Sequence, residues 1–347
     1  MYGFYIDTSI HQLGYVTGLI RELNGILYTD SELSYKIVEK DFPWISVKYF
    51  DDFNPIIDEM VNDKIRVIIL QDFQYKKFKT LRDKNVKFVQ VFHGACDKSY
   101  NINREILKYD LVCVVGEKMY RDLKDKKLDR KKNLIITGNP KADVIFNNIY
   151  NRNEEIKKLG LNPDKKNVLY APTWLDGMGN SSFRKFGIDL PDYFPSEYQL
   201  TIKLHPNIYL YNKKLVNKLK SKIKDKKNIL LLEDAEDIYD IVPIMAASDL
   251  LITDVSGVSH EYIAFLRPMI FLDNKSIIRF LYGRKRTRIW KTGDVVSDIK
   301  KLPAVIRKNL SKPNRYRDIQ LKVLKEIYSY TDGKSVDRIV KAIKSLV

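Results

Sequence analysis

The chain has few of the residues that build metal centres and disulfide frameworks. Its 347 residues include two cysteines and four histidines. Cys96 and Cys113 are not spaced as in a metal site or a disulfide framework, and a reduced intracellular setting is the default for such a sequence. We therefore expect no bound metal and no cofactor.

The sequence also lacks long apolar runs and the common phosphate-binding motifs. No run approaches the length that spans a bilayer, and residues 1–7 resemble a strand without the basic start of a signal peptide. A membrane role would then be peripheral. Walker, G-x-G-x-x-G and H-x-x-x-H motifs are absent, as are repeats of short period.

Acidic residues are outnumbered, with 44 Asp and Glu against 61 Lys and Arg, so the net charge is +17. This excess predicts an anionic partner, which could be nucleic acid, a membrane surface or a phosphorylated substrate. The stretch Arg279–Lys291 mixes cations with aromatics. Such a stretch binds nucleic acid or anionic lipid, or is a solvated loop. A basic nucleic-acid-binding protein is therefore one alternative function.

What the chain does contain is a regular alternation of apolar strands and helices. Its length suits two α/β domains. We predict strands at residues 2–6, 65–70, 86–92, 111–115, 134–137, 168–171, 200–204, 229–232, 250–253 and 269–272. Residues 26–50 should include strands of unknown register, and 142–160 one long helix. Terminal helices are expected at 297–309, 314–331 and 335–346.

A polar stretch with proline, 161–167, is the expected linker between the domains. We therefore place an N-terminal domain at 1–160 and a C-terminal domain with the terminal helices at 161–347. Residues 175–195 are rich in Gly, Ser and Pro, so we expect a mobile loop over the cleft between the domains.

The stretch around residues 249–273 is the most informative. The strand 250–253 is followed by the turn 254–257 and then by apolar residues at helical spacing. Such a turn puts a hydroxyl, a glycine and backbone N–H groups at a helix N-terminus, where a phosphate or diphosphate binds readily. The alternative is an ordinary strand–helix turn with an N-cap.

Two further strands end at a histidine. Strand 86–92 leads into His93-Gly94, followed by Lys98, and strand 200–204 leads into His205-Pro206. In parallel sheets ligands bind beyond the carboxyl ends of the strands. His93 can accept a proton near neutral pH, and Lys98 can neutralise phosphate charge. The alternative is that both histidines only hydrogen-bond their loops. Cys96 is expected to be a bystander thiol.

Five stretches together resemble the CDP-glycerol glycerophosphotransferases, the primases and polymerases of teichoic acid and related capsule polymers. They are His93-Gly94-x-x-x-Lys98, Gly138-Asn139-Pro140-Lys141, Leu169-Tyr170-Ala171-Pro172-Thr173-Trp174, Lys203-Leu204-His205-Pro206, and Leu251-Ile252-Thr253-Asp254-x-Ser256 followed by Arg267-Pro268. The resemblance covers roughly residues 88–273.

The resemblance implies two Rossmann-like domains facing a cleft, the fold called GT-B, with the N-terminal domain on the acceptor side and the C-terminal domain binding the donor. It implies that His93 is the base and that His205 contacts donor phosphate. The remaining residues implied in donor binding are Lys98, Gly138, Pro172, Thr173, Lys203, Thr253, Asp254, Ser256, Gly257 and Glu261.

The chain departs from the family pattern around the turn 254–257 and just before His93. Gly257 stands where a second Ser is usual, and Val255 where an aromatic is usual. His260-Glu261 replaces Phe-Asp, and Phe92 replaces Trp before the first His. Losing a Ser hydroxyl leaves the backbone N–H for a diphosphate, and Glu261 can still accept hydrogen bonds from a ribose. The alcohol carried by the donor stays open between glycerol, ribitol and a sugar.

The function implied is transfer of a polyol phosphate from a CDP-linked donor to a hydroxyl of a lipid-linked or polymeric acceptor. Such an enzyme would work at the cytoplasmic face of the cell membrane, peripherally bound to anionic lipid, without binding nucleic acid. A GT-B glycosyltransferase using a nucleotide sugar is the main alternative. A hydrolysing sugar-nucleotide epimerase is a third, although few carboxylates of its site are evident.

Overall fold

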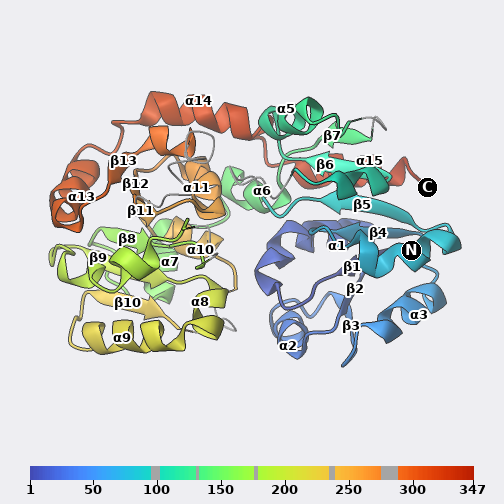
Figure 1. The fold of residues 1–347 in the computed structure, drawn as a ribbon, viewed down its shortest axis with the longest axis horizontal. Helices are drawn as coiled ribbons and strands as arrows, with labels where there is room; N and C mark the ends of the chain where they lie inside the picture. Colours follow the sequence, from blue (N-terminus) through green and yellow to red (C-terminus); the bar gives the residue numbers. More distant parts are fainter. Residues whose placement is uncertain (95–101, 130–132, 176–178, 234–238, 275–287) are drawn as a thin grey trace. The chain divides into compact units, whose positions relative to one another are not determined.

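The computed structural model describes residues 1–94, 102–129, 133–175, 179–233, 239–274 and 288–347. Among these residues the chain forms two compact units. The first contains Met1 to Asn147 and the C-terminal segment Lys325–Val347, and the second is Asn148–Leu324. Each unit is built on its own parallel sheet (Figure 1).

The first unit holds a seven-stranded sheet in the order β3-β2-β1-β4-β5-β6-β7. Every neighbouring pair is parallel. The chain order reverses between β1 and β4, which is where an open α/β sheet leaves a crevice for ligands. The strands are β1 (Tyr2–Tyr5), β2 (Ile26–Thr29), β3 (Ser46–Tyr49), β4 (Val67–Leu70), β5 (Lys87–Val91), β6 (Leu111–Val114) and β7 (Leu134–Ile136).

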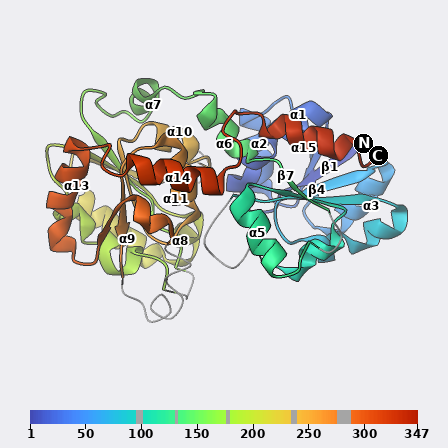
Figure 2. The same ribbon diagram turned by 90° about the horizontal axis from the view of Figure 1, so that it is seen from above.

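Helices and short turns of helix connect these strands. They are η1 (Ile10–Tyr15), α1 (Thr17–Leu23), α2 (Glu32–Asp41), α3 (Asn54–Asn62), α4 (Tyr75–Phe78), η2 (Lys79–Lys84), η4 (Arg104–Lys108), α5 (Glu117–Asp125), α6 (Pro140–Phe146) and the C-terminal α15 (Ser335–Lys344). Figure 2 shows α15 beside α1. The contact is tight, because a Cβ on Gly18 would come within 2.8 Å of Val336 Cγ2.

The second unit holds a six-stranded sheet in the order β10-β9-β8-β11-β12-β13, again with every neighbouring pair parallel. Counted along the chain this is the Rossmann order 3-2-1-4-5-6, with its reversal between β8 and β11. The strands are β8 (Asn167–Tyr170), β9 (Gln199–Lys203), β10 (Ile229–Leu232), β11 (Leu250–Thr253), β12 (Met269–Leu272) and β13 (Asp294–Val296).

The helices and helical turns of this unit include single turns as well as full helices. They are α7 (Arg152–Lys158), η5 (Phe183–Gly187), η6 (Leu190–Asp192), α8 (Pro206–Tyr211), α9 (Lys213–Ile223), α10 (Val242–Ala246), α11 (Gly257–Tyr262), η7 (Ile263–Phe265), η8 (Arg288–Thr292), η9 (Ile299–Lys301), α13 (Leu302–Ser311) and α14 (Arg317–Ile327), of which residues 325–327 already belong to the first unit. Strand β13 was not predicted from the sequence.

The domain boundary lies earlier than the expected linker. Residues 142–160 form two helices rather than one, because Asn148 has a φ of 52° and Asn151 caps the start of α7. Arg152 on α7 then binds Asp249 with two nitrogens, at 3.1 and 2.6 Å, and the carbonyls of Pro163 and Lys165. These bonds fix α7 and the polar stretch after it to the second unit.

The C-terminal helix α15 was expected in the C-terminal domain, but it packs in the first unit. The Asp143 carboxylate accepts a hydrogen bond from Val336 N, at 3.0 Å, and Asn147 donates to the Gly333 carbonyl, at 3.1 Å. Burial raises the pKa of Asp143 despite the hydrogen bond from Val336 N. A domain split in one place along the sequence therefore leaves the C-terminal helix on the wrong side.

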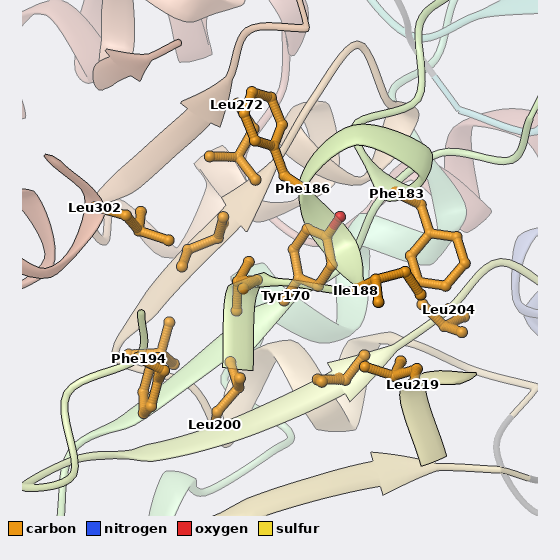
Figure 3. Packing of buried hydrophobic residues seen from close by; sticks show 14 of the residues in the cluster. Tyr170, Phe183, Phe186, Ile188, Phe194, Leu200, Leu204, Leu219, Leu272 and Leu302 are labelled. Carbon is orange, nitrogen blue, oxygen red and sulfur yellow. The ribbon is translucent and has the colours of Figure 1, made fainter. Parts of the chain in front are cut away.

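The segment expected to be a mobile loop contributes to the hydrophobic core of the second unit in its described part, 179–195. Phe183, Phe186, Ile188, Leu190 and Phe194 are all buried. Figure 3 shows Phe183, Phe186 and Tyr170 of β8 as members of one buried cluster. The expectation of a loose loop was wrong, since Gly and Pro here shape turns between buried aromatic residues.

Candidate active site

The predicted donor-binding residues of the second unit gather at the carboxyl edge of its sheet. Strand β8 lies between β9 and β11, with Tyr170 opposite Ile202 on one side and Ile252 on the other. The loops after these three strands carry Thr173, His205 and Ser256. They therefore leave neighbouring strands at the reversal of chain order, where nucleotides bind in this kind of sheet.

Asp254 joins two of these loops from inside the unit. It is fully buried, and its carboxylate accepts hydrogen bonds from Thr173 N at 2.9 Å and from Ser182 N and Oγ at 2.6 and 2.8 Å. Its carbonyl accepts one from Trp290 Nε1, at 3.3 Å. Buried carboxylates need such donors to stay ionised. Asp254 thus ties the exit of β11 to the exit of β8 and to the segment at 182.

Thr253 is buried in the same way. Its hydroxyl donates to the carbonyl of Ala171, at 2.6 Å. Pro172 and Thr173 are also buried, with Thr173 only 4% exposed. The strand ends and the Pro172–Thr173 turn are therefore held in register by contacts within the unit.

Ser256 and Gly257 end the turn 254–257, where Ser256 is 8% exposed and Gly257 is half-buried. Ser256 caps α11, and its Oγ accepts a hydrogen bond from Val258 N at 3.3 Å. A Cβ added at Gly257 would meet no described atom within 4 Å. Among the described atoms there is thus open space beside Gly257, at the position where the family usually has a serine. Glu261, one turn further along α11, is 8% exposed.

His205 caps α8 and lies beside an aromatic ring. Its Nδ1 accepts a hydrogen bond from Asn207 N at 3.2 Å, so in the neutral ring the hydrogen is on Nε2. The rings of His205 and Trp174 are 6.5 Å apart between centroids. Lys203, at the end of the same strand, is buried. Nε2 of His205 is accordingly a hydrogen-bond donor, which suits an anionic oxygen.

His93 belongs to the first unit and follows β5. Its Nδ1 lies 3.1 Å from Asp72 Oδ1 and 3.0 Å from the Gln71 carbonyl oxygen. Both partners accept hydrogen bonds, so we assign the hydrogen to Nδ1 and the lone pair to Nε2. Gly94 has a φ of 97°, which only glycine adopts readily. Glycine after the histidine therefore lets the backbone take a left-handed conformation that other residues rarely adopt.

Asp72 was missed in the sequence. It comes two residues after β4, and its other oxygen accepts a hydrogen bond from Gln12 Nε2 at 2.7 Å. Gln74 donates in turn to Asp7, at 3.1 Å. The sequence did contain a signal for Asp72. His93 drew attention because it follows the carboxyl end of a predicted strand, and Asp72 follows the carboxyl end of the neighbouring strand β4 in the same way.

Gly138 also lies in the first unit, and the described contacts account for its presence there. Its φ is 93°, and a Cβ would come within 2.2 Å of Ser335 Oγ at the start of α15. Asn139 then caps α6, accepting from Lys141 N at 3.0 Å. The Gly-Asn-Pro-Lys motif therefore forms the turn on which α15 packs.

Two predicted features lie outside the described residues. They are Lys98, together with Cys96, and most of the basic stretch, residues 279–287. Over the ranges that are described, no three His, Cys, Asp or Glu side chains gather where they could hold a metal ion. The described helices include none with the length and apolar character needed to cross a bilayer.

Solved structures of known proteins have the same fold. The wall teichoic acid polymerase TagF superimposes with a TM-score of 0.74 at 18% identity, covering 99% of this chain and 88% of that one. A putative UDP-N-acetylglucosamine 2-epimerase from Listeria monocytogenes gives a TM-score of 0.67 at 14% identity, covering 99% and 96%. These likenesses and the two Rossmann-type sheets confirm the predicted GT-B class of fold.

Curated relatives are more similar in sequence. The teichoic acid poly(glycerol phosphate) polymerase of Bacillus spizizenii is 34% identical over 41% of this chain and 35% of its own length. The ribitol-phosphate polymerase TarL of Staphylococcus aureus is 28% identical over 61% and 37%. The glycerol-phosphate primase of B. spizizenii is 26% identical over 68% and 64%. The chain thus spans little more than a third of the two polymerases.

The family resemblance seen in the motifs holds over most of the chain. A family model described as CDP-glycerol:poly(glycerophosphate) glycerophosphotransferase matches residues 60–345. That range contains both strand-end histidines, the buried Asp254 and the turn at Ser256. The chain belongs to the CDP-glycerol:poly(glycerophosphate) glycerophosphotransferase family.

Proposed function

We propose that the protein transfers a polyol phosphate from a CDP-linked donor to a hydroxyl of a lipid-linked or polymeric acceptor. Membership of the family supports this. The observation that carries it is the convergence of the β8, β9 and β11 exits, with Thr173, His205 and Ser256, at the reversal of strand order in the second unit.

In this proposal the second unit binds the donor. The backbone N–H groups and hydroxyl of the turn at Ser256 and Gly257 hold the diphosphate, and Nε2–H of His205 donates to a phosphate oxygen. Lys203 and Lys98 supply positive charge, and Glu261 accepts from the ribose. The indole of Trp174, 38% exposed beside His205, covers one side of the phosphates.

Three of the residues first assigned to donor binding take a supporting role in this proposal. Thr253 and Asp254 have their polar atoms bonded within the unit, so they hold the Pro172–Thr173 and Ser256 turns in position. Gly138 shapes the turn against α15 in the first unit. None of the three needs to touch the nucleotide for the donor site to form.

His93 is the proposed base. Its Nε2 takes the proton from the acceptor hydroxyl as that oxygen attacks the distal phosphorus of the donor. A new P–O bond forms to the acceptor, the bridging P–O bond breaks, and CMP leaves with the bridging oxygen. The two histidines then differ in the way that the chemistry requires, because Nε2 accepts a proton in His93 and donates a hydrogen bond in His205.

We further propose that the first unit serves the acceptor and that the protein works peripherally at an anionic membrane surface on the cytoplasmic side. The net charge of +17 supports an anionic surface and a polyanionic acceptor. The exposed Leu210 and Tyr211, next to Lys213 and Lys214, offer apolar side chains beside cations for such a surface.

The experiment uses CDP-glycerol, CDP-ribitol and UDP-sugars as donors and measures binding and turnover separately. We expect a CDP-linked polyol to raise the melting temperature and to be consumed when an acceptor is present. His93→Asn should bind the donor as the wild type does and lose turnover, whereas His205→Ala should weaken donor binding. Stabilisation by UDP-sugars alone would reject the proposal.

A further inference from the structure

We propose that Asp72 is a positioning residue for the reaction, which fixes the ring of His93 with its hydrogen on Nδ1 and its lone pair on Nε2. This inference rests on the proposed role of His93 as the base. It assigns a function to a residue that lies in none of the motifs of the family resemblance.

The geometry of the carboxylate supports this role. Asp72 Oδ1 is 3.1 Å from His93 Nδ1, which is hydrogen-bond distance for an imidazole N–H and a carboxylate. The Gln71 carbonyl oxygen, 3.0 Å from the same nitrogen, can orient a neutral ring but carries no full charge. The carboxylate gains more interaction energy than the carbonyl dipole when the ring takes up a proton, because its full negative charge is opposite to the charge of the imidazolium.

The carboxylate is itself held in place. Gln12, which is buried in η1, donates to Asp72 Oδ2 at 2.7 Å. The two oxygens of Asp72 therefore have separate partners, and the side chain cannot rotate away from His93 without losing one of them. Tyr109 also donates to the Asp72 carbonyl, at 3.3 Å, so the backbone at this point is bonded too.

Strand order explains why these residues meet. Strands β4 and β5 are neighbours, with Leu70 opposite Gln90. Asp72 follows Leu70 by two residues and His93 follows Gln90 by three, so the side chains leave adjacent strands at the same edge. Gln12 comes from the loop after β1, the neighbour of β4 on its other side. Asp72 thus lies beside the reversal of strand order between β1 and β4, with Gln12 from the loop after β1 and His93 from the loop after β5 as its partners.

The test combines a structural and a kinetic measurement on Asp72→Asn. The nitrogen-15 spectrum of histidine-labelled protein reports the tautomer of His93, and the four histidines are few enough to assign with a His93→Gln reference. We expect the Nε2–H form of His93 to rise in Asp72→Asn. The kinetic measurement is the rate of CMP release. For Asp72→Asn we expect kcat to fall on the order of 100-fold, with the KM for the donor within about threefold of the wild type.

Asp110→Asn is the matched control, since Asp110 is a partly buried aspartate in the same unit that binds Arg82 and Phe88 N. It should lower stability and leave the His93 spectrum and kcat unchanged. Gln12→Met keeps the carboxylate and loses its anchor, so it should lower kcat less than Asp72→Asn. This variant keeps the test open if Asp72→Asn does not fold.

Two results would overturn the inference. One is an Asp72→Asn protein with the wild-type tautomer of His93, and the other is a changed tautomer with kcat within about twofold of the wild type. If wild-type protein transfers nothing from any CDP-linked donor, the proposed function fails instead. The spectrum of His93 still decides in that case whether Asp72 sets the tautomer.

Discussion

Asp254 gives the sharpest test of which residues support the donor site and which contact the donor. Replacing Asp254 with asparagine keeps the size of the side chain and removes one of two acceptor oxygens. In the wild type one oxygen receives Thr173 N–H and the other receives Ser182 N–H and Oγ–H. The asparagine amide can accept at one of these positions and must place its NH₂ group at the other.

The loss of stability in Asp254→Asn follows from the hydrogen-bond donors that lose their acceptor. The Ser182 hydroxyl can turn and accept from the new NH₂ group, but one backbone N–H in a fully buried place loses its partner. Such a loss costs about 1–3 kcal/mol, and the weaker bond at the remaining oxygen adds to it. Removing the buried charge offsets part of this. We expect about 2–3 kcal/mol in total, or a melting temperature about 4–12 °C lower.

The measurement is a thermal melt of Asp254→Asn with and without CDP-glycerol. Asp189→Asn serves as a control in the same unit, because Asp189 is exposed and its pair with Lys222 should matter little. We expect a lower melting temperature for Asp254→Asn with a donor affinity close to that of the wild type. A wild-type melting temperature combined with lost donor binding would refute the reasoning, since the carboxylate would then contact the ligand.

Three further predictions concern the domain boundary at Arg152, the turn at Gly257 and binding to an anionic membrane. Arg152→Ala should lower the free energy of unfolding by about 3 kcal/mol in a denaturant titration. Burial raises the pKa of Asp249, but hydrogen bonds from Arg152, the Asn167 backbone and Lys166 outweigh burial and hold that pKa below its ordinary value. The stability that this carboxylate contributes should therefore fade as the pH falls below about 3.9, and Arg152→Ala should reduce that dependence. Gly257→Ser should fold normally and lower the donor KM about fivefold, whereas a lower melting temperature would contradict the open space seen there. Co-sedimentation with anionic vesicles should fall steeply with salt, and salt-independent binding would contradict an electrostatic contact.

The strands were predictable because a buried parallel strand is a short apolar run with few alternatives. The run 250–253 is strand β11 with the same bounds, and 229–232 is β10. Strand β13 was not predicted because it has three residues, begins with Asp294 and is not fully buried. Its place in the sheet depends on pairing with β12, which the local sequence does not reveal.

Residues of the candidate site could be predicted only where a side chain able to bind or react follows a predicted strand. His93, His205 and Ser256 all follow buried strands, and the structure keeps them at the carboxyl edges of their own sheets. The burial of Asp254 could not be foreseen, because it depends on Ser182 and Thr173, which lie 72 and 81 residues away. The same holds for α15, whose partners Gly18 and Asp143 lie in the first half of the chain.

The nucleotide released in the reaction tests the central claim most directly. Attack on the distal phosphorus breaks the bond between the two phosphates and releases a nucleoside monophosphate, whereas glycosyl transfer releases a nucleoside diphosphate. A single turnover with CDP-glycerol and a lipid-linked acceptor, followed by chromatography of the nucleotides, distinguishes the two. We predict CMP in equal amount to the glycerol phosphate gained by the acceptor, and CDP as the product would contradict the account.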